Sequence, residues 1–196
     1  MATLQLTLAI LKPDIVARPH VVKEIKDIIL QNRFLFVRSK VMHLNKEQAG
    51  SFYGEHKGKF FHNRLVTYMS GGPLSAHILA REDAIKHWRT LMGPTKVFKT
   101  IHEAPDTIRG RFGLTDTRNS THGSDSPESA KKEINFFFPE FSFDGWHRNE
   151  ALFQNANFDF DVERTIHVLD RAINLDVSFE ERFWHKTDKL PMPPNS

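Results

Sequence analysis

Strand-like and helix-like segments alternate along most of the chain, and this order constrains the fold more than any other feature of the sequence. Apolar residues occupy every second position over residues 4–10, the period of a strand, and recur at helical spacing over residues 19–31. The order repeats with strands at 34–44 and 74–80, helices at 45–53, 61–70, 85–92 and 126–138, and an apolar pair, Phe112 and Leu114, before the last helix. This pattern predicts a small sheet with helices packed on it, but it leaves the order of the strands open.

Two regions depart from the alternation. Residues 96–105 show no clear period, so we expect a long loop there, followed by Arg109 on irregular backbone. After Trp146 the composition shifts toward Asn, Asp and Phe. One helical period in this part runs through Val162, Ile166, Leu169 and Ile173. We therefore predict a domain over residues 1–145 and a partly helical extension over residues 146–196, whose proline-rich end is expected to be disordered.

The composition limits the chemistry that the chain can perform. Its 196 residues are 39% hydrophobic and 26% charged, which is ordinary for a globular domain with an appendage. Without cysteine there are no disulfides, thiolate nucleophiles or common structural zinc sites, so His, Lys, Arg and carboxylates must carry any chemistry. The formal charge of +3 is small and scattered, and no helix concentrates Lys and Arg, which argues against specific nucleic-acid recognition. No apolar run matches a membrane span and the strand pattern begins by Leu4, so we expect a soluble intracellular protein with no signal peptide.

One histidine marks the most reactive segment of the chain. His122 lies among hydroxyls, a carboxylate and a glycine in residues 118–126, and a neutral imidazole can attack an electrophile without first losing a proton. Gly123 would let the backbone turn tightly behind the ring, while Ser124 and Asp125 offer hydrogen bonds to a transferred group. From the residues alone, a serine-rich turn with a chance histidine stays open. Asn119 also begins a glycosylation acceptor sequence, which would matter only on a secretory route.

Three separated motifs resemble the nucleoside diphosphate kinase family. Residues 119–126 resemble its active-site signature, residues 8–14 its first strand with a phosphate-side lysine, and residues 107–110 its arginine turn. The motifs stand in the family's order over the first three quarters of the chain, and the second half is most similar to the divergent nucleoside diphosphate kinase 6 subgroup. The resemblance implies an α+β fold with a ferredoxin-like antiparallel sheet. It also implies ping-pong transfer of the γ-phosphoryl group of a nucleoside triphosphate to a nucleoside diphosphate through a phosphohistidine.

The resemblance further implies roles for ten residues and one cofactor. The catalytic set is His122 as the nucleophile, Glu133 and Ser124 to orient its imidazole, and Tyr53 to support the site. The nucleotide-binding set is Lys12 and Asn119 at the ribose and terminal phosphate, Phe61 under the base, and Arg89, Thr95 and Arg109 at the phosphates. Mg²⁺ would bridge the phosphates with no direct protein ligand. From the residues alone, a solvated lysine is the favoured reading of Lys12, and a core residue is the favoured reading of Phe61.

Three departures from the family pattern bear on binding and assembly. Phe60 replaces a proline before Phe61, residues 96–105 are longer than the usual family loop and lack its Asn-Pro, and the extension after Trp146 has no counterpart in short members. We expect nucleoside triphosphates and diphosphates as ligands, and a monomer or small oligomer rather than a hexamer. The apolar stripe of the C-terminal extension is expected to pack either on its own domain or on a protein partner, and we expect a location in the cytoplasm or the mitochondrion. The open alternative is a regulatory or adaptor protein that keeps the nucleotide-binding fold with weak or no kinase activity.

Overall fold

The structure, a computed structural model, describes residues 3–169 and contains a four-stranded antiparallel sheet. Its strands are β1 (Gln5–Leu11), β2 (Leu35–Met42), β3 (Leu74–Arg81) and β4 (Thr121–Gly123). They stand in the order β2-β3-β1-β4, and each neighbouring pair is antiparallel. The predicted α+β class with a ferredoxin-like sheet is confirmed, and the strand order that the pattern left open is now known.

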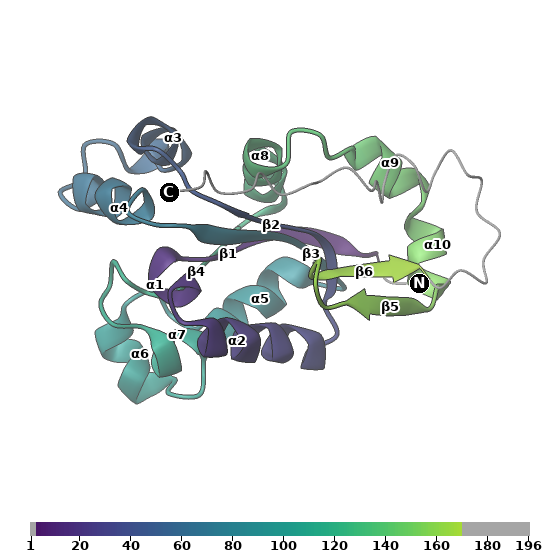
Figure 1. The fold of residues 1–196 in the computed structure, drawn as a ribbon, viewed down its shortest axis with the longest axis horizontal. Helices are drawn as coiled ribbons and strands as arrows, with labels where there is room; N and C mark the ends of the chain where they lie inside the picture. The colour runs from purple at the N-terminus through teal and green to yellow at the C-terminus, as the bar shows by residue number, and fades with distance from the viewer. Residues whose placement is uncertain (1–2, 170–196) are drawn as a thin grey trace, which may run out of the picture.

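Helices cover both faces of this sheet (Figure 1). One layer contains α3 (Lys46–Phe52), α4 (His62–Met69), α8 (Pro127–Phe137) and α9 (Phe143–Arg148). The other contains α1 (Pro13–Val16), α2 (Pro19–Gln31), α5 (Ala84–Met92), α6 (Val97–Glu103) and α7 (Ile108–Phe112). A 3-10 turn, η1 (Gly54–His56), follows α3, and α10 (Glu150–Asn155) follows α9. None of the helices within residues 3–169 has the length and apolar character needed to cross a membrane.

The central strand β1 shows why both faces are covered. Leu8 and Ile10 enter the core beneath α3, α4 and α8, whereas Ala9 and Leu11 enter the core beneath α2 and α5. All four side chains are fully buried. A strand that is apolar on both faces needs a helical layer on each side, because either layer alone would leave one set of side chains in water.

The region predicted as a long loop is helical, so that prediction was wrong. α6 turns Val97 into the protein but leaves Phe98 79% exposed. An apolar residue on the solvent side breaks the helical period, which is why the sequence pattern hid this helix. Arg109 was expected on irregular backbone but lies on α7, which is capped at its start by the hydroxyl of Thr107.

The fourth strand also differs from the pattern. Phe112 ends α7 and Leu114 is 57% exposed, so the apolar pair is not a strand. The fourth strand is β4, which contains His122 and pairs with the last residues of β1. Three residues are too few to show a period of two, so this strand left no signal in the sequence. His122 is consequently held by the central strand of the sheet.

The C-terminal extension forms a hairpin where a helix was predicted. β5 (Phe158–Asp161) pairs antiparallel with β6 (Ile166–Leu169). Val162 lies just after β5 with 76% of its surface exposed, while Ile166 and Leu169 are buried against their own domain. The apparent helical spacing therefore came from residues on either side of a turn. Ile173 and the proline-rich end lie outside the described residues, and α9 crosses the predicted domain boundary at 145/146.

Candidate active site

His122 is held on β4 between β1 and α5. Its backbone is in register with Ile10, and its carbonyl accepts a 3.1 Å hydrogen bond from the indole N–H of Trp88. Gly123 permits this contact, because a Cβ atom there would lie 2.4 Å from the Cδ1 atom of Trp88. The predicted tight turn at Gly123 is therefore wrong, since the glycine serves the close approach of a tryptophan ring to the strand.

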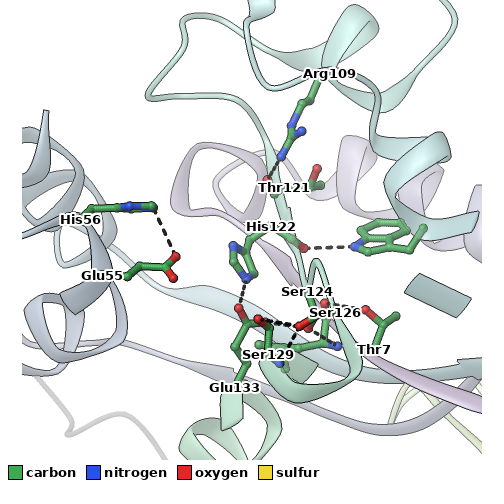
Figure 2. Close-up of polar contacts among 12 residues, drawn as sticks. Thr7, Glu55, His56, Arg109, Thr121, His122, Ser124, Ser126, Ser129 and Glu133 are labelled. Atoms are coloured by element: carbon green, nitrogen blue, oxygen red, sulfur yellow. Dashed lines mark hydrogen bonds and ion pairs between the residues drawn. The ribbon is translucent and has the colours of Figure 1, made fainter. Parts of the chain in front are cut away.

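A carboxylate lies against the imidazole of His122, and a hydroxyl holds that carboxylate in place (Figure 2). Glu133 on α8 places Oε1 3.0 Å from His122 Nε2, although the two atoms are not aligned as a hydrogen bond. Ser124 Oγ donates a 2.6 Å hydrogen bond to Glu133 Oε2 and accepts a 3.2 Å hydrogen bond from the Leu8 N–H. β1 thus fixes the carboxylate through Ser124. A carboxylate beside Nε2 favours a proton on that nitrogen and leaves the lone pair on Nδ1.

Two aromatic rings pack edge-on against the same imidazole. Phe52 and Tyr53, at the end of α3, have ring centroids 5.2 and 6.1 Å from the centroid of His122. Tyr53 is buried, and its hydroxyl has no hydrogen-bond partner within residues 3–169. Burial and then the charge of Glu133 raise the pKa of Tyr53, so the phenol stays protonated. The site therefore holds a buried donor that is free to meet a ligand oxygen.

Lys12 is buried at the exit of β1, so the reading of Lys12 as a solvated lysine is wrong. Its ammonium donates a 2.5 Å hydrogen bond to Asn119 Oδ1, and its backbone N–H donates to the Ser120 carbonyl. Burial first, and then the charge of Arg109, lower the pKa of Lys12 to about 7, while Asp14 acts in the opposite direction. A buried lysine with a lowered pKa gains its charge readily when an anion approaches.

Arg109 braces the backbone around His122. Its guanidinium donates to three carbonyls, those of Gly93 at 2.8 Å, Thr121 at 3.0 Å and Asn119 at 3.3 Å. Burial and then the charge of Arg89 lower the pKa of Arg109 to about 10. Because a guanidinium has five N–H donors, two remain for a ligand after these three bonds.

A cleft of about 800 Å³ runs along α5 beside these groups. It gathers three of the predicted phosphate ligands, Arg89, Thr95 and Arg109, together with Asp125. Among the described residues that line it, neither His122 nor Phe61 appears. The predicted set is thus divided between this cleft and the surroundings of His122. Arg109 joins the two parts through its bond to the Thr121 carbonyl on β4.

Phe61 combines the two roles that the sequence left open. It is half-buried at the start of α4 and packs against the core, yet it keeps part of its ring exposed. Phe60 beside it is 92% exposed, and the two rings stand edge to face with centroids 5.5 Å apart. The ring of His56 lies 5.4 Å from Phe61 and 6.2 Å from Tyr53. His56 was not among the predicted site residues, because the three-residue 3-10 turn that follows Tyr53 is too short to show a period in the sequence.

The acceptor sequence for glycosylation is inside the protein. Asn119 is 3% exposed and Ser120 is fully buried, so neither is open to modification in the folded chain. Within residues 3–169, no group of three or more His, Asp or Glu side chains is arranged to hold a metal ion.

Comparisons with known proteins agree with one another. A family model described as nucleoside diphosphate kinase matches residues 5–143. A protein of Danio rerio named nucleoside diphosphate kinase 6 is 53% identical over 167 residues, which cover 85% of this chain and 95% of that protein. The Homo sapiens protein of the same name is 56% identical over 147 residues, covering 75% of this chain and 79% of that protein.

Solved structures share the fold at appreciable identity. The nucleoside diphosphate kinase of Aquifex aeolicus superposes with a TM-score of 0.66 at 40% identity, covering 69% of this chain and 95% of that one. The enzyme of Halobacterium salinarum, solved in complex with CDP, superposes with a TM-score of 0.64 at 33% identity, covering 68% of this chain and 87% of that one.

Proposed function

This chain belongs to the nucleoside diphosphate kinase family and to its nucleoside diphosphate kinase 6 subgroup, and from that premise we propose that it transfers phosphoryl groups between nucleotides through His122. The donor is the γ-phosphoryl group of a nucleoside triphosphate and the acceptor is a nucleoside diphosphate. The observation that carries the proposal is the contact of Glu133 with Nε2 of His122, braced by Ser124. That arrangement leaves Nδ1 as the nitrogen with a lone pair.

The chemistry proceeds in two balanced steps. In the first step, Nδ1 of His122 attacks the γ-phosphorus, a P–N bond forms, the bond to the bridging oxygen breaks, and the nucleoside diphosphate leaves with that electron pair. In the second step, the terminal phosphate oxygen of another nucleoside diphosphate attacks the phosphohistidine, and the P–N bond breaks. Splitting one transfer into two displacements is the usual advantage of a covalent intermediate.

The surrounding residues bind and neutralise the phosphates. Lys12 and Arg109 are buried basic groups, and a bound phosphate would stabilise their positive charge. The Tyr53 hydroxyl beside the imidazole has no hydrogen-bond partner within residues 3–169 and can donate to a phosphate oxygen. Arg89 and Thr95, at the cleft, bind the remaining phosphate oxygens. Mg²⁺ bound to the nucleotide phosphates would neutralise charge and fix their geometry.

Labelling with γ-³²P ATP and magnesium tests the proposal. The wild-type protein should acquire a label that acid removes and base preserves, and His122→Ala should acquire none, because only the His122 imidazole lies against the carboxylate that leaves Nδ1 as the nucleophile. His20→Ala is the matched control, since His20 is exposed on α2 away from the site, and it should be labelled like the wild type. Label at the wild-type level in His122→Ala would show that another residue is the nucleophile.

The same experiment separates a kinase from an adaptor protein. If the wild-type chain binds ADP in a calorimeter but takes no label from ATP, the proposed activity is wrong and the fold serves binding alone. Labelling followed by release of the label to added CDP or UDP is the result expected of a kinase, since a ping-pong enzyme must pass on the group that it accepts.

We also propose that the chain is a monomer or a small oligomer, because its own hairpin covers the outer strand at one edge of the four-stranded sheet. β2 is an outer strand of the sheet, and exposed outer strands pair readily with other chains. β6 lies against β2, where the Phe36 N–H donates a 2.8 Å hydrogen bond to His167 Nδ1 and Ser39 Oγ donates a 2.6 Å bond to the Thr165 carbonyl. The ring of Phe160 packs 5.5 Å from that of Phe36.

Light scattering on the full chain and on a chain ending at residue 156 tests this assembly. The shorter chain keeps α10 and loses the hairpin, so it should form larger species if the hairpin is what covers β2. The full chain should have the mass of one or a few copies, and a hexameric full chain would overturn the proposal. A shortened chain that stays at the full chain's number of copies would show that the hairpin is not the obstruction.

A further inference from the structure

A row of four rings connects the proposed phosphoryl acceptor with the proposed base platform. The ring of Tyr53 lies 6.1 Å from His122, the ring of His56 lies 6.2 Å from Tyr53, and Phe61 lies 5.4 Å from His56. The His56 and Tyr53 rings are nearly parallel, with an angle of 18° between their planes. Figure 2 shows Glu55 and His56 on the side of the site opposite the strand that carries His122.

His56 is held in this row by polar contacts on both of its nitrogens. Lys59 Nζ lies 3.3 Å from Nδ1, and Glu55 Oε1 lies 3.5 Å from Nε2. A charged lysine can only donate, so the imidazole accepts at Nδ1 and carries its proton on Nε2, facing the carboxylate. The neutral tautomer satisfies both neighbours at once.

Burial is the main reason that His56 favours its neutral form. Burial lowers the pKa of His56 most, and the charge of Glu55 opposes it. The charges of Lys59, His122 and His62 act in the same direction as burial. The lone pair on His56 Nδ1 can therefore accept a hydrogen bond from Lys59 Nζ at neutral pH. Lys59 Nζ also lies 5.8 Å from the centroid of the Phe61 ring.

His56 is also the inner support of Phe61. The loop between them is exposed at Lys57, Gly58 and Lys59, and Gly58 adopts a φ of 86° in its turn. The other ring beside Phe61 is Phe60, which is 92% exposed and faces solvent. Phe61 also packs against the core, and the ring of His56 is the aromatic contact that joins it to Tyr53 beside His122.

We infer that His56 is a positioning residue, which sets the place of the Phe61 base platform relative to His122. The inference rests on the proposed function, since it concerns how base stacking and phosphoryl transfer are brought into one geometry. If it holds, loss of the His56 ring leaves Phe61 less firmly placed and lowers the affinity for every phosphoryl donor that carries a base. A small donor without a base should react with His122 as before, because the contacts of Glu133 and Ser124 with the nucleophile remain.

Two phosphoryl donors separate these effects. The first is γ-³²P ATP, which uses the base platform. The second is ³²P phosphoramidate, from which a phosphoryl group passes to an imidazole nitrogen as the P–N bond to the leaving ammonia breaks. His56→Ala should raise the KM for ATP about tenfold, the scale of one lost stacking contact, with a smaller change in kcat. Its labelling by phosphoramidate should stay within about twofold of the wild type.

Two further variants sharpen the test. His56→Phe keeps a ring between Tyr53 and Phe61 and should recover most of the ATP affinity, whereas a purely polar role of His56 would leave this variant as weak as His56→Ala. Lys57→Ala is the matched control, because Lys57 is exposed in the same loop and directly follows His56. It should behave like the wild type with both donors.

The outcomes distinguish the inference from the proposed function. A wild-type protein that takes label from neither donor overturns the proposed function and the inference with it. A wild-type protein labelled by both donors, with an unchanged KM for ATP in His56→Ala, overturns the inference alone. Equal losses with both donors in His56→Ala also overturn it, because a positioning role acts only on the donor that has a base.

Discussion

Nucleotide binding should draw a proton from solvent above pH 7, and Lys12 should be the group that takes it up. The free protein holds Lys12 among buried groups, where burial and the charge of Arg109 lower its pKa to about 7. A phosphate bound at this position supplies the negative charge that the ammonium lacks. The pKa of Lys12 should then return toward the ordinary lysine value of about 10.4.

The size of the effect follows from the two pKa values. With a free pKa of about 7, Lys12 is about 10% protonated at pH 8, about 50% at pH 7 and about 90% at pH 6. The bound form is protonated throughout this range, so uptake should be about 0.9 proton at pH 8 and about 0.1 at pH 6. The sign is that of a group whose pKa rises on binding: affinity is highest below pH 7 and falls by up to about tenfold per unit above it.

Isothermal titration calorimetry measures this uptake directly. Mg²⁺ and ADP would be titrated into the protein at pH 8 in two buffers with different enthalpies of ionisation, and the slope of the binding enthalpy against the buffer enthalpy gives the number of protons. Lys12→Gln keeps an N–H donor on a side chain one atom shorter but cannot titrate, so the difference between the two proteins isolates the proton taken up by Lys12. Wild-type uptake below about 0.2 proton at pH 8, or equal uptake in both proteins, would refute the reasoning.

Three further measurements address the site. Gly123→Ala should lower the free energy of unfolding by about 1–3 kcal/mol in urea, because the added methyl group overlaps the tryptophan beside it, while Gly50→Ala, with nothing within 4 Å, should be neutral or stabilising. Glu133→Ala should slow phosphoenzyme formation by about 10–100-fold, a milder loss than that of the nucleophile, and equal losses would give Glu133 another role. ATP, GTP, CTP and UTP should compete within about a hundredfold of one another, since Phe61 offers a ring face worth about 1–3 kcal/mol per base, and a preference of several thousandfold would require a contact to the base edge.

Most helices and strands could be predicted from the sequence, because their buried residues recur with the period of a helix or a strand. The capping box at Asn45 and Gln48, the proline after Ser126 and the glycine that ends α5 stand at the ends of helices that the sequence predicted over 45–53, 126–138 and 85–92. Each of these signals is local and chemical, so it is visible without tertiary contacts. α6 was not predicted because Phe98 and Ile101 face solvent and break the helical period. The hairpin was predicted as a helix because Val162 and Ile166, on either side of its turn, are four residues apart.

The residues of the candidate site could be predicted only from the motifs that resemble those of the family. Contacts that join distant segments left no trace in the sequence, such as the bond from Ser124 to Glu133 or the ring of His56 against Tyr53. The glycine in the signature was recognised, but its reason was not, because the tryptophan that requires it lies 35 residues earlier in the chain. Packing partners of that kind become visible only when the fold is known.

The position of Arg109 on α7, where irregular backbone was predicted, changes how the site is understood. Two basic side chains, Lys12 and Arg109, are buried near each other, and burial is the main reason that the pKa of each is lowered. Such a pair repels and would move apart on a free loop. Arg109 cannot move in this way, because it sits on α7 and its guanidinium is bound to the carbonyls of Gly93, Asn119 and Thr121. The fold thus keeps the two cations together before any ligand arrives, and an anion that binds between them relieves the repulsion instead of reorganising the protein.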